Sequence, residues 1–296
     1  MTIRDYITDC IDRLAPIYPA AEAKAIAFRL MEHFTDTPSY KYIAEPDLVI
    51  PGLTGNLDPE GDSPLLSALD ELVTGRPLQY VLGFTEFCGH RFKVGEGCLI
   101  PRPETEELVS RIIDDLSGTE IGEEPFNILD MCTGSGCIAW SLAAAFPEAM
   151  VYGCDLSDAA LRYACRQRVK VGGAKPIFFT ADVLSAPPAG LPKFDVIVSN
   201  PPYICDSEKA EMRPNVLDFE PAEALFVPDD DPLVFYRAIA RWVGALLRPA
   251  PSGADPQPAG RIYLEINERF GSEVAALFPG SRVLPDITGR DRFVIC

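Results

Sequence analysis

The sequence predicts an α/β protein with a seven-stranded, mostly parallel sheet whose last strand is antiparallel, preceded by a small helical domain and a β-hairpin linker. Apolar residues recur at helical spacing at the start of the chain, a segment of aromatic residues and glycines follows, and then come seven short apolar runs. Because helical segments separate most of these runs, we expect helices on both faces of the sheet. We place the three regions at residues 1–75, 76–103 and 104–296.

The first region has the pattern of a small helical domain. Its expected helices cover residues 3–14, behind Thr2 as N-cap, residues 21–34, and the segment from Ser63-Pro64 to Gly75. The stretch between Pro46 and Pro64 is rich in Pro, Gly and Asp, which indicates a long loop.

The second region, with Phe84, Phe87 and Phe92 among closely spaced glycines, is expected to form a hairpin. The apolar runs of the third region lie at residues 127–131, 150–154, 177–180, 195–199, 261–266, 282–284 and 293–296. No helical segment separates the last two, so the final strand should return antiparallel. The segment from Pro249 to Gly260, with four prolines and two glycines, is expected to be a surface loop.

Composition excludes several classes of function. The 296 residues carry a net charge of −18, which repels phosphate backbones, so nucleic acid is not expected as a direct partner. The first residues do not form a signal peptide, and the longest apolar stretch, 137–146, is far shorter than the roughly 18 residues of a membrane span. Nine cysteines without a CxxC indicate reduced thiols, and two histidines are too few for a His-rich zinc site. We therefore expect a cytoplasmic, monomeric, metal-free protein.

A glycine loop points to a nucleotide site. Residues 128–139 read as a buried strand, a turn containing Thr133, Gly134 and Gly136, and the start of a helix. Asp155 ends the next strand, where an acid can accept both hydroxyls of a ribose, and Asp182 ends the third, near an adenine edge. In register, these elements predict a Rossmann-like adenosine site, but they fit a dinucleotide and S-adenosylmethionine equally.

The tetrapeptide Asn200-Pro201-Pro202-Tyr203 follows the fourth strand and suits a planar amide or amino nitrogen. The Asn200 side-chain carbonyl and the Pro201 main-chain carbonyl can accept the two N–H bonds of an NH₂ group. Tyr203 offers an aromatic face to a flat group and to the positive charge of a methyl sulfonium. The alternative is a turn that merely ends the strand.

Together these motifs resemble the release-factor glutamine methyltransferase family, also called HemK-like. The resemblance runs through most of the chain beyond residue 75 and is carried by residues 75–80, 100–108, the glycine loop, 198–204, 219–221 and 289–292. The Asn-Pro-Pro-Tyr tetrapeptide alone also occurs in adenine-N6 methyltransferases, whereas its combination with the Arg-Pro-Glu-Thr-Glu run from Arg102 is specific.

The resemblance implies a methyltransferase sheet, S-adenosylmethionine as donor, S-adenosylhomocysteine as product, and the glutamine of the Gly-Gly-Gln motif in class I release factors as acceptor. The N-terminal helices would help to hold that protein. Asn200, Pro201 and Tyr203 would be catalytic, and these three with Pro202 and Glu104 would bind substrate. The donor would be bound by Thr133, Gly134, Gly136, Asp155, Asp182 and Asn200. For Glu104, ordinary helix-start chemistry is the alternative.

Three positions depart from the family pattern. Cys132 replaces the first glycine of the loop, Asn267 replaces a glycine after Leu-Glu-Ile, and residues 228–232 replace a Gly-x-Asp-Gly segment. Related enzymes that methylate a glutamine of a ribosomal protein can carry cysteine in the loop, so that substrate stays open.

Two further classes also stay open. One is a nucleic-acid adenine methyltransferase, but residues 204–232 hold nine acids against Lys209 and Arg213, a balance that would repel phosphates. The other is a module that binds an adenine nucleotide without chemistry, which would leave the tetrapeptide unexplained. The expected mechanism is direct transfer of the methyl group to an amide nitrogen, without a strong general base.

Overall fold

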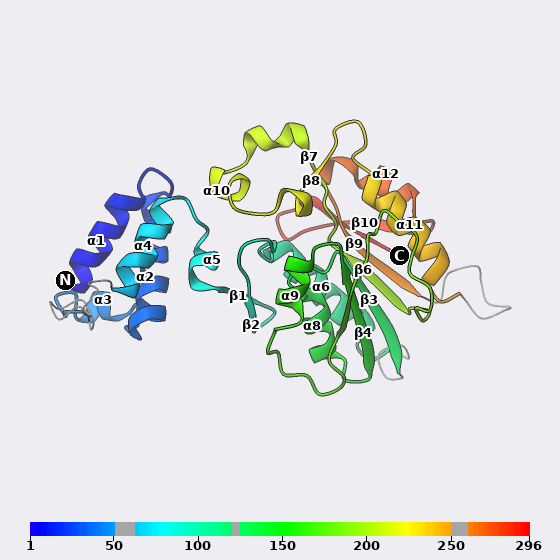
Figure 1. The fold of residues 1–296 in the computed structure, drawn as a ribbon, viewed down its shortest axis with the longest axis horizontal. Helices are drawn as coiled ribbons and strands as arrows, with labels where there is room; N and C mark the ends of the chain where they lie inside the picture. The colour runs from blue at the N-terminus through cyan, green and yellow to red at the C-terminus, as the bar shows by residue number, and fades with distance from the viewer. Residues whose placement is uncertain (51–62, 120–124, 250–259) are drawn as a thin grey trace. The chain divides into compact units, whose positions relative to one another are not determined.

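The computed structural model describes residues 1–50, 63–119, 125–249 and 260–296, and its chain divides into two compact units (Figure 1). The first unit comprises residues 1–83 and 213–219, and the second comprises residues 84–212 and 220–296.

The second unit contains the predicted seven-stranded sheet, in the order β10-β11-β9-β6-β3-β4-β5. Its strands are β3 (Phe126–Met131), β4 (Ala149–Asp155), β5 (Ile177–Thr180), β6 (Val196–Ser199), β9 (Arg261–Glu265), β10 (Arg282–Pro285) and β11 (Asp291–Ile295). The pairs of β3 with β4, β3 with β6, β4 with β5 and β6 with β9 are parallel. β11 runs antiparallel to both β9 and β10, so the prediction of an antiparallel last strand is confirmed.

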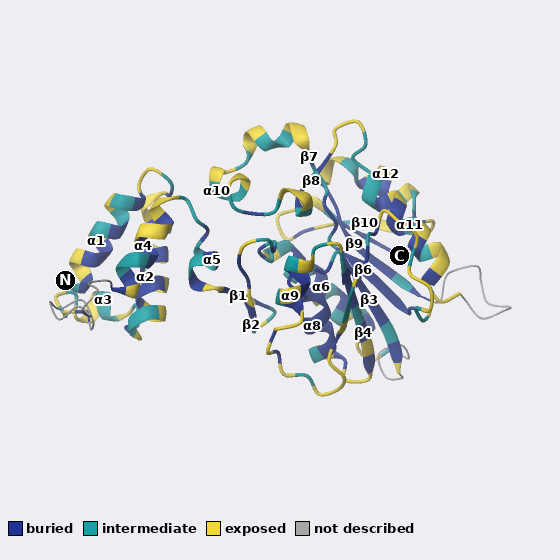
Figure 2. Ribbon diagram, in the orientation of Figure 1, coloured by how far each residue is buried: buried dark blue, intermediate teal, exposed yellow. Residues whose placement is uncertain are grey.

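Helices form a layer on each face of the sheet, as predicted (Figure 1). Buried side chains of α6 (Pro103–Leu116) and α8 (Cys137–Ala145) pack with Ile128 of β3, while α11 (Val234–Leu246) and α12 (Gly271–Ala276) pack with its neighbour Leu129. Successive residues of a strand point to opposite faces, which is why one apolar run supplies both cores. α9 (Asp158–Ala164) packs on β4 and β5. Figure 2 shows the strands as the most continuously buried part of this unit.

The first unit is helical, as its spacing predicts. α1 (Ile3–Leu14) begins with a capping box in which Thr2 and Asp5 each bond the other's main chain, and it packs on α2 (Ala20–Thr35) and α4 (Pro64–Val73). Pro64 occupies the first turn of α4, but the Ser63 side chain makes no capping hydrogen bond. The structure adds the short helix α3 (Lys41–Ala44). Residues 51–62 of the predicted loop and 250–259 of the predicted insert lie outside the described residues.

A hairpin forms where the linker is predicted, from β1 (Phe84–Phe87) and β2 (His90–Lys93). Its two turn residues, Cys88 and Gly89, both have positive φ, the backbone that a two-residue hairpin of this hand requires. The preceding residues form a helix instead, α5 (Leu78–Leu82), between Pro77 and the left-handed Gly83. Aromatic and β-branched residues in that stretch resemble a strand, but flanking Pro and Gly favour a single helical turn.

Short elements that the sequence does not predict connect β6 to α11. They are β7 (Ile204–Cys205), paired in parallel with β8 (Phe226–Val227), and the 3₁₀ helices η1 (Asp206–Glu211) and η2 (Ala222–Ala224); a third 3₁₀ helix, η3 (Glu268–Phe270), follows β9. Between them, α10 (Pro214–Leu217) belongs to the first unit, where Arg213 pairs with Glu22 at 3.0 Å. Across the described ranges, none of the helices is long and apolar enough to cross a bilayer.

The centre of the sheet depends on a missing side chain at Gly153 of β4. A Cβ there would lie 2.7 Å from the Phe178 ring and 2.9 Å from Oγ1 of Thr133. We therefore predict that Gly153→Ala lowers the free energy of unfolding by about 1–3 kcal/mol through overpacking. The control is Gly244→Ala in α11, where a Cβ would meet no atom within 4 Å and should stabilise the helix by about 0.5–1 kcal/mol. Denaturant unfolding measures both, and equal effects would contradict the packing argument.

Candidate active site

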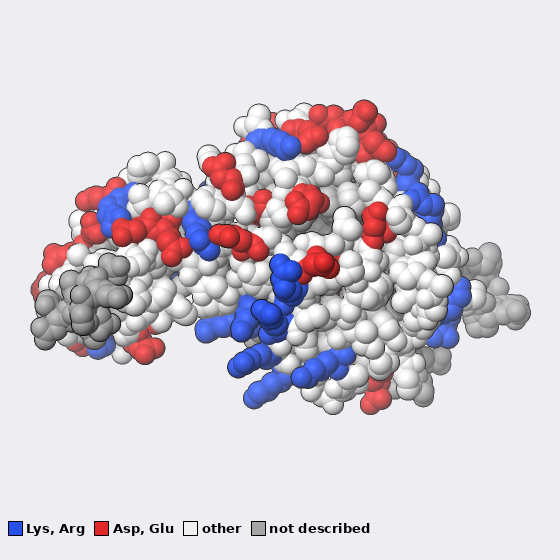
Figure 3. Space-filling view, viewed as in Figure 1, with Lys and Arg blue, Asp and Glu red and all other residues white. Residues whose placement is uncertain are grey.

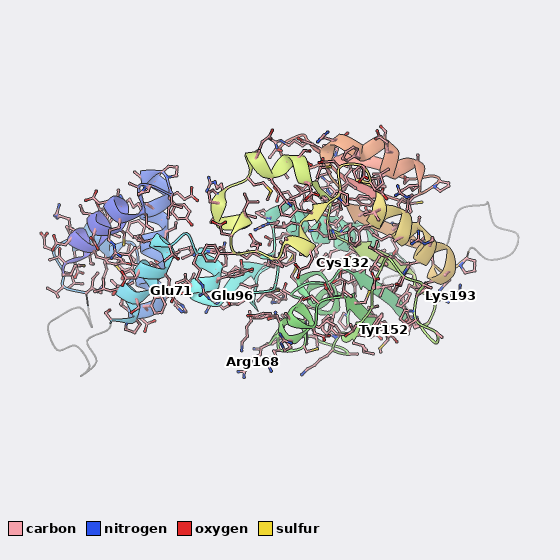
Figure 4. All side chains as sticks on the ribbon, turned by 45° about the horizontal axis from the view of Figure 1, so that its top comes forward. Glu71, Glu96, Cys132, Tyr152, Arg168 and Lys193 are labelled. Atoms are coloured by element: carbon pink, nitrogen blue, oxygen red, sulfur yellow. The ribbon has the colours of Figure 1, made fainter. Side chains whose placement is uncertain are left out.

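A cavity of about 340 Å³ opens at the carboxyl ends of the parallel strands, where α/β sheets bind ligands. Six of its lining residues belong to the motifs that the sequence analysis singled out: Cys132, Gly134, Asp155, Asp182, Asn200 and Pro202. Figure 4 labels Cys132 among the elements that form this end of the sheet. The structure thus brings together most of the residues predicted to bind a donor.

The glycine loop after β3 has an unusual backbone. Cys132, Gly134 and Gly136 all have positive φ, at 58°, 55° and 77°. A Cβ at Gly134 would meet no atom within 4 Å, so the loop leaves open space at the cavity, whereas one at Gly136 would lie 3.0 Å from Phe178. Cys132 adopts a left-handed backbone that costs a side chain roughly 1–2 kcal/mol, which gives a physical reason why glycine is usual there.

Asp130 holds the loop in place, a role that the sequence analysis missed. Its fully buried Oδ2 accepts hydrogen bonds from Thr133 Oγ1 at 2.5 Å and from the Ala139 N–H at 3.1 Å. Burial raises the pKa of Asp130 to about 7, although both hydrogen bonds lower it. Thr133 and Gly136, predicted to bind the donor, are buried in this support rather than in the cavity lining.

The two predicted acids stand at the cavity wall. Asp155 accepts the Gly134 N–H at 2.8 Å and the Ser157 N–H at 2.9 Å, which ties β4 to the glycine loop. Burial raises its pKa, while these hydrogen bonds lower it. A carboxylate has about four acceptor positions, so Asp155 keeps acceptor capacity for a ligand hydroxyl beside its main-chain hydrogen bonds. Asp182 accepts the Leu184 N–H at 2.9 Å and the Ser185 hydroxyl at 3.0 Å.

The tetrapeptide follows β6 directly, as predicted. Asn200 donates from Nδ2 to Thr105 Oγ1 at 2.9 Å. Among the described residues, no hydrogen bond reaches Asn200 Oδ1 or the Pro201 carbonyl oxygen. These are the two acceptors that the sequence assigns to an incoming amide. Asn200 and Pro202 line the cavity; Pro201 and Tyr203 are not part of its lining.

Tyr203 is held by two residues at the carboxyl end of β9. Its hydroxyl donates to Glu265 Oε1 at 2.9 Å, and its carbonyl oxygen accepts from Asn267 Nδ2 at 3.1 Å. Asn267 Nδ2 also donates to Glu208 Oε2 at 2.9 Å. The asparagine that departs from the family pattern is therefore an anchor of the tetrapeptide, since a glycine could make neither bond.

Glu220, which follows α10 in the sequence, binds the proline-rich segment that precedes α6. This buried carboxylate accepts the Ile100 N–H at 3.0 Å and pairs with Arg102 Nη2 at 2.7 Å. Glu104, predicted to bind substrate, lies half-buried in the first turn of α6 and is not part of the cavity lining. In the replaced segment 228–232, Asp229 accepts from the main chain and the hydroxyl of Ser207.

Comparison with known proteins identifies proteins that are similar to this chain. Residues 115–217 match the family model described as "Methyltransferase small domain". The chain is 37% identical over 286 residues to a protein of Bacteroides thetaiotaomicron named "Release factor glutamine methyltransferase", covering 95% of each chain. A protein of Flavobacterium psychrophilum with the same name is 37% identical over 303 residues, covering 99% of this chain and 98% of the relative. Among solved structures, TrmN from Thermus thermophilus aligns with a TM-score of 0.43 and 21% identity over 63% of this chain and 47% of its own.

Proposed function

Because the chain belongs to the release factor glutamine methyltransferase family, we propose that it methylates the side-chain amide nitrogen of the glutamine in the Gly-Gly-Gln motif of class I release factors, using S-adenosylmethionine. The observation that carries the proposal is a pair of tetrapeptide acceptors that take no hydrogen bond from the described residues, Asn200 Oδ1 and the Pro201 carbonyl oxygen. Asn200 lines the cavity, and Pro201 precedes Pro202, which also lines it.

The chain's residues fit the donor. Asp155 keeps acceptor positions for ribose hydroxyls, Asp182 can accept from an adenine edge, and Gly134 leaves the loop open to the cavity. When bound, the donor supplies an electrophilic methyl group on a sulfonium. The residues that hold the donor would be Gly134, Asp155 and Asp182, while Asn200, which lines the same cavity, would meet the transferred methyl group and the acceptor amide without adding much donor affinity.

The protein's task is to make a poor nucleophile reactive. An amide nitrogen delocalises its lone pair into the carbonyl, and two acceptors that hold both N–H bonds favour a pyramidal nitrogen with the pair exposed. Fixing that nitrogen in place supplies proximity, which contributes up to about 7–11 kcal/mol in ideal cases. The methylated nitrogen is acidic until it loses one proton to water, so no protein base is assigned.

Charge argues against a nucleic-acid acceptor. The segment that follows the tetrapeptide, residues 204–232, holds nine acids and two bases. On the face that Figure 3 shows, acidic side chains predominate in the upper part, while basic side chains are scattered and form one denser group at the lower centre. Phosphates near the tetrapeptide would meet repulsion that a protein loop does not. None of the nine cysteines forms a disulfide in the described residues, which supports a reducing compartment, and we propose the cytoplasm.

The deciding experiment uses labelled donor with four acceptors: a class I release factor, its variant with the motif glutamine replaced, a ribosomal protein preparation, and adenine-containing DNA. Transfer to the first alone supports the proposal. Transfer to ribosomal protein or DNA instead would assign one of the alternatives, and binding of donor without transfer to any acceptor would favour a module without chemistry.

For the donor site, we predict that Asp155→Ala weakens S-adenosylmethionine binding by about 1–3 kcal/mol, the scale of hydrogen bonds to a charged group. Calorimetry measures the affinity, and thermal unfolding monitors the loop that Asp155 supports. Asp158→Ala is the matched control, because Asp158 is exposed in α9 and bonds only Thr180 among the described residues. Equal affinity of wild type and Asp155→Ala would remove Asp155 from the donor site.

For the tetrapeptide, we predict that Asn200→Ala lowers kcat about 100- to 1000-fold with nearly unchanged donor affinity, as for loss of one preorganised hydrogen-bonding group. The control is Asn127→Ala, whose Nδ2 donates to the Lys193 carbonyl oxygen at the other end of the sheet. If Asn200 only ended a strand, the variant would lower Tm and keep its turnover. A kcat within about threefold of wild type would exclude Asn200 from the chemistry.

For the first unit, we propose a role in holding the release factor, through the side chains of Tyr40 and Ile43. Tyr40 is the N-cap of α3 and 65% exposed, and Ile43 lies within α3 and is 85% exposed. The double variant Tyr40→Ser, Ile43→Ser should raise KM for the release factor about tenfold, as for loss of an apolar anchor, and leave donor affinity unchanged. Ile287→Ser, at a side chain 90% exposed in the second unit, is the control. An unchanged KM would exclude this surface.

A further inference from the structure

Four side chains form a continuous chain of hydrogen bonds behind the cavity. Asn200 Nδ2 donates to Thr105 Oγ1 at 2.9 Å, and Thr105 Oγ1 donates to Glu265 Oε2 at 2.7 Å. On the other carboxylate oxygen, Glu265 Oε1 accepts the Tyr203 hydroxyl at 2.9 Å. Thr105 is 3% exposed and Glu265 is 0% exposed, so water does not compete for these bonds.

The direction of this chain follows from the chemistry of its end. An ionised carboxylate only accepts, so the single hydroxyl proton of Thr105 must point at Glu265. The Thr105 oxygen then has only lone pairs to offer Asn200, and Asn200 must present its NH₂ group to Thr105. Its carbonyl oxygen Oδ1 is thereby left for the cavity.

We propose that Glu265 and Thr105 are positioning residues that determine which end of the Asn200 amide meets the substrate. The two ends of an amide have nearly the same shape but opposite hydrogen-bonding character. A reversed Asn200 would turn N–H donors toward the N–H bonds of the substrate amide and would oppose binding. This inference rests on the proposed function, because it requires an acceptor at Asn200.

Glu265→Gln tests the direction of this chain of hydrogen bonds, because an amide has one acceptor oxygen and cannot accept from both Thr105 and Tyr203. If its NH₂ group faces Thr105, the chain reverses and Thr105 can donate to Asn200 Oδ1; if it faces Tyr203, that hydroxyl loses its acceptor. We expect Glu265→Gln to lower kcat about tenfold or more, with donor affinity unchanged. The matched control is Tyr236→Phe. The Tyr236 hydroxyl donates to the main-chain oxygen of Glu265 at 3.0 Å, so its removal perturbs the same strand and leaves the hydrogen bonds of the Glu265 side chain in place.

A second test separates positioning from general damage to the fold. Thr105→Val keeps the shape and removes the hydroxyl, so kcat should fall about tenfold, whereas Thr105→Ser should stay within about threefold of wild type. Introduced on Asn200→Ala, Thr105→Val should cost almost nothing further, because the group it orients is gone. The measurements are kcat and KM on release factor, donor Kd and Tm, each on the full chain.

The outcomes are distinguishable. If wild type transfers no methyl group to any glutamine acceptor, the proposed function fails and this inference falls with it. If wild type is active but Thr105→Val keeps its kcat, or its loss is the same with and without Asn200→Ala, the inference alone is overturned. Should Glu265→Gln fail to fold, the Thr105 series decides. The inference is supported if Thr105→Ser keeps kcat near wild type and if the kcat losses of Thr105→Val and Asn200→Ala are not additive.

Discussion

One row of the parallel ladder aligns the groups of the site. Cys154, Met131, Ser199 and Leu264 are successive partners across β4, β3, β6 and β9. The residue that follows each of them, Asp155, Cys132, Asn200 and Glu265 respectively, therefore lies one step further along its strand. Because parallel strands share their direction, all four arrive at the same edge of the sheet. The backbone pairing alone thus aligns Asp155, which we propose to bind the donor, with residues of the glycine loop and of the tetrapeptide.

The strands and the turn residues that follow them were largely predictable from the sequence, because apolar runs and turns follow local rules. The order of the strands in the sheet and the register of their pairing were not predicted. Seven runs gave seven strands, and the glycine loop, Asp155 and Asn200 lie at the cavity. The hydrogen bonds that hold the site residues in place were not predictable, because they join residues far apart in the sequence. Thr105 and Glu265 are 160 positions apart, and Ile100 and Glu220 are 120 apart. No spacing rule connects such residues, although Thr105 and Glu220 both lie within segments that carry the family resemblance.

The site is held by polar groups in places where polarity is costly. Asp130 and Glu265 are both fully buried, and burial raises the pKa of each. Glu265 offsets this cost with hydrogen bonds at both oxygens, whereas Asp130 Oδ1 has no partner among the described residues. Together with the left-handed backbone of Cys132, this indicates that the loop trades some stability for a fixed geometry.

The path of the chain between the two units constrains how this protein can change. Residues 213–219 belong to the first unit, yet they lie between Met212 and Glu220 of the second, so the backbone passes between the units three times. Phe219 in this segment lies near Gly75, at 3.6 Å from where a Cβ there would stand. A chimera that exchanged only the amino-terminal helices would keep residues 213–219 of the original chain next to foreign helices. Replacing the helical unit as a whole therefore requires exchange of two separate stretches of sequence, which a single crossover cannot achieve.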